Sequence, residues 1–117
     1  MASQSEHKKK YEENRRVLNN QLSIDNADNY NWITTIAFYS ALHLVEAVLA
    51  SYGFHGTSHK ARGNQVNTYA DFRNIRAKYK ILHTNSINAR YAGFSVSKEV
   101  AQQSLQYLED IEKEIGI

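Results

Sequence analysis

The sequence predicts an all-α protein, built as a four- to five-helix up-and-down bundle. The 117 residues include no proline and only five glycines, so few residues interrupt a helix. The longest apolar segment, residues 32–52, carries apolar side chains around most of a helical wheel, as a helix enclosed by other helices does. The length fits one domain, residues 1–117, which is large enough to bury a core.

The elements up to the central helix follow from local signals. Residues 1–6 are polar with nothing to bury, and we expect them to be frayed or to form an exposed first turn. An amphipathic helix is predicted over residues 7–22, followed by a polar turn in which Asp25 or Asp28 caps the central helix. That helix should end where Gly53 can adopt a left-handed conformation.

The second half is predicted as a glycine-rich loop followed by further helices. The loop covers residues 53–63. A helix is predicted over residues 64–82, with a buried stripe formed by Phe72, Ile75, Tyr79 and Leu82 in steps of three and four. The polar segment 86–91 can form only a short helix. A serine, Ser95 or Ser97, then caps a last amphipathic helix. Antiparallel helices with connections of this length form a bundle.

The cellular setting follows from what the sequence lacks. It has no cysteine, which excludes disulfides and thiolate metal ligands. No charged start followed by an apolar segment marks a secretion signal, so we expect a cytoplasmic protein. The central apolar segment is long enough to cross a membrane, but it contains His43 and Glu46, and polar side chains are costly in lipid. We therefore expect a buried bundle helix and no membrane partner.

Charge is distributed unevenly along the chain. Residues 60–90 contain seven basic residues and one acidic residue, whereas the whole chain has a net charge of +2. Such a segment can bind an acidic partner such as nucleic acid, or it can be a solvated face paired with acidic segments of the bundle. Both interpretations stay open here, and so does binding of nucleic acid by the basic stripe of residues 69–83.

Two polar residues interrupt the central apolar segment. His43 and Glu46 are three residues apart and therefore share one face of the predicted helix. A carboxylate can orient an imidazole and raise its pKa, as in an acid–base couple. The alternative is a buried polar contact that fixes how the helices pack. In either case both residues need partners inside the fold.

A group of cations in the glycine-rich loop is a candidate anion site. His59, Lys60 and Arg62 combine positive charge with a flexible backbone and can contact a phosphate. The alternative is a solvated loop. The histidines of the chain have no recognised metal-ligand spacing, and no known enzyme or cofactor signature occurs. We predict no metal and no cofactor.

Several segments, in their order along the chain, resemble the HEPN superfamily, the higher-eukaryote and prokaryote nucleotide-binding helical bundles. The central segment contains FYSALHLVEAVLASYG, the loop contains SHKARG, the next segment ends YKIL, and SINARYAGF precedes an amphipathic tail. FYSALH is similar to the YYAAFH-like second helix of that family, and Ala89-Arg90-Tyr91 is similar to its R..ADY region. The resemblance covers nearly the whole chain. It implies a four- or five-helix bundle that usually forms a homodimer, often encoded beside a minimal nucleotidyltransferase or within defence and toxin systems.

The resemblance also bears on catalysis. Many HEPN members are metal-independent ribonucleases with an Arg, four to six residues, and then a His, which serve as phosphate stabiliser and acid or base. That spacing occurs here at Arg76 and His83. The family, however, places the motif near the start of the helix that follows the segment of Arg90. Arg90 has no His within six residues after it, and Tyr91 replaces the usual polar residue.

We therefore predict a non-catalytic HEPN-like module that binds a nucleotide, RNA or a protein partner, for example a nucleotidyltransferase-type protein, in a toxin–antitoxin or defence system. Its ligand-binding residues are predicted to be His43, Glu46, His59, Arg62, Arg90 and Tyr91. One alternative is a metal-independent ribonuclease that uses Arg76 and His83, and another is a purely structural dimerisation module. We expect His43, His59, Arg62, Arg90 and Tyr91 to line one cleft, which requires these side chains to converge in the folded chain.

Overall fold

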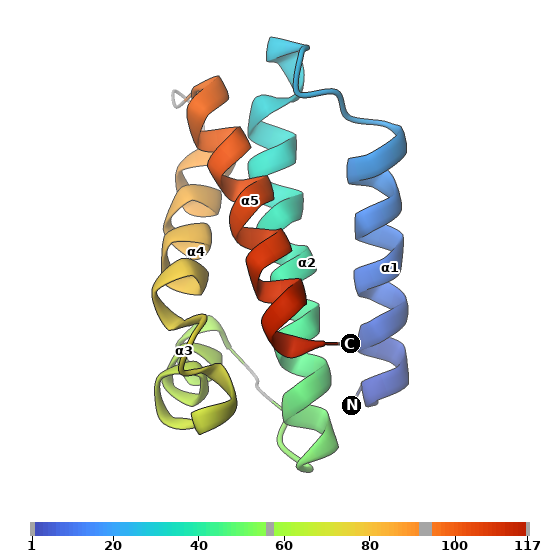
Figure 1. The fold of residues 1–117 in the computed structure, drawn as a ribbon, viewed down its shortest axis with the longest axis vertical. Helices are drawn as coiled ribbons and strands as arrows, with labels where there is room; N and C mark the ends of the chain where they lie inside the picture. The colour runs from blue at the N-terminus through green and yellow to red at the C-terminus, as the bar shows by residue number, and fades with distance from the viewer. Residues whose placement is uncertain (1, 56–57, 92–94, 117) are drawn as a thin grey trace.

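Five α-helices and two short 3-10 helices form the chain in a computed structural model, which describes residues 2–55, 58–91 and 95–116 (Figure 1). The elements are α1 (Gln4–Asn20), η1 (Ala27–Asn29), α2 (Tyr30–Ser51), α3 (His59–Thr68), η2 (Ala70–Phe72), α4 (Arg76–Arg90) and α5 (Lys98–Ile115). No strand occurs among the described residues, so the predicted all-α class is confirmed.

The four long helices run alternately up and down the long axis of the molecule, which measures 40 Å against 25 Å and 24 Å for the other two axes (Figure 1). In Figure 1, α2 lies between α1 and α4, and α5 crosses in front of it. The short helix α3 lies at the end of the bundle where α4 begins. The predicted up-and-down bundle is therefore confirmed, with α2 at its centre.

Most of the central helix α2 is buried by its neighbours, as its apolar residues predict. Its fully buried side chains include Ile33, Phe38, Leu44 and Leu49. Burying each of them contributes about 1.5–3 kcal/mol. By length and composition alone the segment Ala27–Ser51 could cross a membrane, but 67% of its most apolar window is buried inside the bundle. The core helix of a bundle has the same properties.

Side-chain caps set where two of the helices begin. Ser3 accepts a hydrogen bond from the backbone N–H of Glu6 at 3.1 Å, and the Glu6 carboxylate accepts one from the N–H of Ser3 at 3.2 Å. This capping box starts α1 at Gln4, so residues 4–6 form an exposed first helical turn, which is the second of the two expectations for this segment. Ser97 caps α5 through its side chain, as predicted.

The cap expected for α2 is wrong. Neither Asp25 nor Asp28 caps this helix; instead Asn26 accepts a hydrogen bond from the N–H of Asp28 and starts η1. The 3-10 turn runs directly into α2, and the N–H of Tyr30 donates to the carbonyl of Ala27. The preceding turn therefore provides the partners that a capping side chain would otherwise supply.

The helix predicted over residues 64–82 is divided in two. After α3 the backbone of Tyr69 is extended, with φ −77° and ψ 133°, and η2 and a turn follow before α4 begins at Arg76. Phe72 and Ile75 lie in the core despite this break, and they are 0% and 1% exposed. Burial of these two side chains therefore does not require a continuous helix.

The loop predicted over residues 53–63 is shorter than expected. Ser58 accepts a hydrogen bond from the N–H of Ala61 at 3.1 Å and caps α3, which begins at His59. The cations expected on a flexible loop therefore lie on the first turns of a helix. Residues 56 and 57 of the predicted loop lie outside the described part of the chain.

The separate short helix predicted over residues 86–91 is also wrong, because α4 continues without a break to Arg90. Ser86 is fully buried there, and its hydroxyl donates to the carbonyl oxygen of His83 at 2.8 Å. This bond offsets the cost of burying a polar side chain in the helix. Arg76 and Arg90 therefore lie at the two ends of one continuous helix, about 21 Å apart along its axis.

Candidate functional site: a basic groove between α3 and α4

A groove of about 390 Å³ runs between α3 and α4. Its lining includes three cationic side chains and two imidazoles: Lys60, Arg76, Lys80, His59 and His83. None of the described residues that line it is acidic, so no carboxylate in its wall neutralises this charge. A groove of this composition attracts anions, and phosphate groups in particular.

Two histidines stand side by side on the groove wall. The rings of His59 and His83 have their centroids 4.8 Å apart, and His83 stacks on Phe38 at 4.8 Å with an interplanar angle of 13°. Partial loss of water lowers the pKa of both histidines, and the nearby Arg62 and Arg90 lower the pKa of each further. Both imidazoles are therefore neutral near pH 7, and each has one N–H to donate.

Arg62 fixes the tautomer of His59. Its guanidinium forms an ion pair with the carboxylate of Glu46, a residue that is 3% exposed, and its Nη1 lies 3.0 Å from Nδ1 of His59. Because a guanidinium can only donate, Nδ1 of His59 accepts, and the ring proton is on Nε2. The chain of contacts from Glu46 through Arg62 orients His59 from inside the bundle.

Arg90 extends the positive charge of the groove toward the end of α4. Its Nη1 donates to the hydroxyl oxygen of Tyr39 at 2.8 Å, and its Nε donates to the carbonyl of Ser86 at 3.1 Å. The guanidinium also lies 5.5 Å from the centroid of the Tyr39 ring. That ring is 6.5 Å from the ring of His59. The aromatic side chain therefore links Arg90 to the histidine pair.

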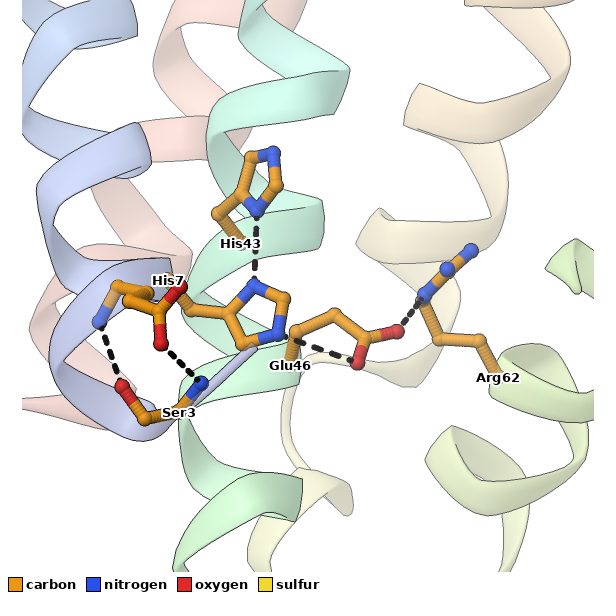
Figure 2. Close-up of polar contacts among 6 residues, drawn as sticks. Ser3, His7, His43, Glu46 and Arg62 are labelled. Atoms are coloured by element: carbon orange, nitrogen blue, oxygen red, sulfur yellow. Dashed lines mark hydrogen bonds and ion pairs between the residues drawn. The ribbon is translucent and has the colours of Figure 1, made fainter. Parts of the chain in front are cut away.

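His43 faces the other side of α2, toward α1. Figure 2 shows His43 beside His7, with their Nδ1 atoms 3.1 Å apart, and Nε2 of His7 is 3.9 Å from the carboxylate of Glu46. Burial, and then the charge of His7, lower the pKa of His43 to about 4. The Glu46 carboxylate contacts His7 on one side and Arg62 on the other, so it lies between the groove and the histidines of the α1 side.

The structure thus brings three of the predicted ligand-binding residues together. His59, Arg62 and Arg90 converge on one side of α2, whereas His43 belongs to the α1 side. Tyr91 stands just after the end of α4 and is 63% exposed. The single cleft expected from the sequence is therefore wrong, because α2 separates its members. A smaller cluster on the side of α3 and α4 replaces it.

Both residues of the ribonuclease alternative line the groove. Arg76, however, uses Nε and Nη2 to donate to the carbonyl oxygens of Val66 and Tyr69, at 2.8 and 2.9 Å. These bonds close the C-terminal end of α3, where carbonyl groups lack helical partners. Two guanidinium nitrogens of Arg76 are therefore committed to the fold, and Nη1 is the one left to face a ligand. His83 is held by its stacking on Phe38.

Sequence reasoning did not find His7 as the partner of His43 and Glu46. The two histidines are 36 residues apart, and only the packing of α1 on α2 brings them together. The only signal in the sequence was that His43 and Glu46, as polar residues on an apolar helix, need polar partners. Across residues 2–55, 58–91 and 95–116, no group of three or more histidine or carboxylate side chains is arranged to hold a metal ion.

Comparison with protein-family models matches residues 7–116 to the family described as HEPN domain. Comparisons with curated proteins and with solved structures give no match. HEPN membership indicates, in general terms, a function related to nucleotides or RNA. The match covers nearly the whole chain and agrees with the helical bundle described above, so this chain belongs to the HEPN domain family.

Proposed function

We propose that this HEPN domain is a non-catalytic module that binds RNA by its phosphate groups in the groove between α3 and α4. The observation that carries the proposal is the lining of the groove, where Lys60, Arg76 and Lys80 accompany two imidazoles and no carboxylate among the described residues. Cationic side chains that follow a phosphate backbone bind nucleic acid with little regard for sequence. The general HEPN association with nucleotides or RNA supports the same function.

A binding role suits the two groove histidines better than an acid–base role. Cleavage by acid–base catalysis needs one group that accepts a proton and another that donates one. Partial loss of water and the neighbouring arginines lower the pKa of both His59 and His83, so both favour the neutral form, which can accept a proton but does not supply the acid. Neutral imidazoles instead offer N–H donors to phosphate oxygens.

The test compares RNA binding by the wild type and by Lys60→Ala/Lys80→Ala. Both lysines are exposed, so their replacement should leave the fold intact. We expect the dissociation constant for a labelled single-stranded RNA to rise by roughly tenfold or more, since two phosphate contacts are lost. The matched control, Arg16→Ala/Lys113→Ala, removes two exposed positive charges from α1 and α5. An equal loss in both variants would show that the groove is not the binding site.

The metal-independent ribonuclease is the second candidate, and one observation favours it: Arg76 and His83 line the same groove. Incubation with labelled RNA in the presence of EDTA separates the two functions. We expect the RNA to stay intact with the wild type and with His83→Ala. Cleavage by the wild type that disappears in His83→Ala would establish the nuclease. A purely structural module would show no shift of Tm with RNA or nucleotides.

A homodimer, a nucleotidyltransferase-type partner and a toxin–antitoxin or defence role in the cytoplasm are further proposals, made on the family resemblance alone. Sedimentation equilibrium of the purified protein tests the dimer. Co-purification with the product of an adjacent nucleotidyltransferase gene, where one exists, tests the partner.

A further inference from the structure

An exposed tryptophan stands at the end of α4 that lies beyond the groove. Trp32, near the start of α2, is 63% exposed, and with Ala89 and Arg90 of α4 it lines a hollow of about 180 Å³. Tyr91, which follows directly after α4, is also 63% exposed. An indole left largely in water beside a guanidinium offers a flat apolar surface and positive charge in one place.

Arg90, which lines this hollow, belongs to a stripe along α4 that also carries two cations of the groove, Arg76 and Lys80. Five residues recur at intervals of three or four along α4 and form one stripe: Arg76, Lys80, His83, Ile87 and Arg90. The stripe is about 21 Å long, at a rise of about 1.5 Å per residue. Arg90 connects the two parts, since it lines the hollow beside Trp32 and also binds Tyr39, whose ring neighbours that of His59.

The chemistry of this path fits a single strand of nucleic acid. A row of cations binds the phosphate backbone, and an exposed aromatic ring stacks on an unpaired base. In a duplex the faces of the bases are covered by their neighbours, so a duplex has no free base face to stack on the indole. We propose that Trp32 is a base-stacking subsite through which the domain selects single-stranded over duplex RNA. The inference rests on the proposed phosphate-binding function of the groove.

Trp32 is the only tryptophan of the chain, so its fluorescence reports on the subsite directly. The experiment titrates the protein with a short oligoadenylate and follows both the tryptophan emission and the anisotropy of a labelled strand. We expect the emission to be quenched along the same curve as the anisotropy. An abasic strand of the same length keeps the phosphates without the bases, so it should bind in the groove and leave the emission unchanged.

The other possible results distinguish failure of the Trp32 subsite alone from failure of the proposed RNA binding as a whole. Binding of oligoadenylate without a change in Trp32 emission would overturn the subsite and leave phosphate binding intact. Equal quenching by the abasic strand would also overturn it, because the change would then come from the phosphates. No binding of any strand would overturn the proposed function and the subsite together.

The variant Trp32→Ala supplies a second measurement. Stacking of a base on an aromatic side chain is worth about 5- to 150-fold in affinity, so we expect a loss of this size for oligoadenylate and none for the abasic strand. Tyr52→Ala is the matched control, since Tyr52 is 59% exposed at the other end of α2. A Trp32→Ala protein with half the mass of the wild type in sedimentation would place Trp32 in an interface between two copies and overturn the subsite.

Discussion

Glu46 places a carboxylate inside the bundle, where the residue is 3% exposed, between Arg62 of α3 and His7 of α1. Removing one partner of a buried ion pair leaves the other charge uncompensated, at a cost of about 3–5 kcal/mol. We expect Glu46→Leu and Arg62→Met each to lower the free energy of unfolding by about this amount. The double variant should lose clearly less than the sum, because it leaves neither charge buried alone. Urea denaturation measures all three, and additive losses would contradict the coupling.

His43 makes the stability of the fold depend on pH. In the folded protein its pKa falls from 6.5 to about 4, mainly through burial. The unfolded chain therefore binds the proton more readily, and the stability contributed by neutral His43 is present above pH 6.5 and is lost as the pH falls toward 4. The loss amounts to about 2 kcal/mol, less than the pKa difference alone gives, because solvent screens a half-buried group. Between pH 7 and pH 4 the Tm of His43→Gln should fall less steeply than that of the wild type; parallel curves would rule this out.

These two residues also show how far single positions can be predicted. A histidine and a glutamate on an apolar helix must have polar partners, and that much follows from the sequence. Which partners they have depends on how α1 and α3 are rotated against α2, which no local pattern encodes. His7 and Arg62 therefore come from the structure, 36 and 16 residues away from the groups they contact.

At the level of the helices, Arg76 joins α3 to α4. Its two hydrogen bonds to the carbonyls of Val66 and Tyr69 require a planar guanidinium, which a lysine cannot imitate. We expect Arg76→Lys to destabilise α3 by about 1.5–3 kcal/mol, seen as faster amide hydrogen exchange in that helix. The charge is retained, so the RNA affinity should change by no more than about twofold. A large loss of affinity with unchanged exchange would instead show that the two carbonyl contacts of Arg76 do not hold α3 and that its guanidinium acts on the ligand alone.

Some helices can be predicted well from the sequence and others cannot. α2 is predictable because its apolar residues surround the helix, and only a buried helix satisfies that pattern. The spacing of Phe72, Ile75, Tyr79 and Leu82 correctly identifies four buried side chains, which are between 0% and 5% exposed. It does not identify the backbone between them, because a 3-10 turn and a bend can present the first two to the core as well as a helix can. The prediction of a continuous helix is therefore wrong at Tyr69, whereas the prediction of its buried residues is confirmed.

Across the whole molecule, the fold neutralises some of the basic residues of segment 60–90 and leaves others available. Lys78 forms an ion pair with Asp110 of α5 at 2.9 Å, and Arg62 is paired inside the bundle. Lys60 and Lys80 have no acidic partner within ion-pair distance among the described residues. Each interpretation of the basic segment therefore holds for some of its residues, and the unpaired lysines Lys60 and Lys80 are the ones that line the groove.

RNA binding that uses this unpaired charge must weaken with salt in a defined way. For a single strand, the logarithm of the binding constant falls by about 0.7 per phosphate contact for each tenfold rise in salt. Lys60→Ala/Lys80→Ala should therefore make the slope shallower by about 1.4, as measured by anisotropy over a series of KCl concentrations. Lys78→Ala is the control on the same helix, and its slope should match the wild type because Asp110 already neutralises that lysine. An equally shallow slope in Lys78→Ala would mean that RNA lies along the α5 side of α4 and displaces the ion pair there.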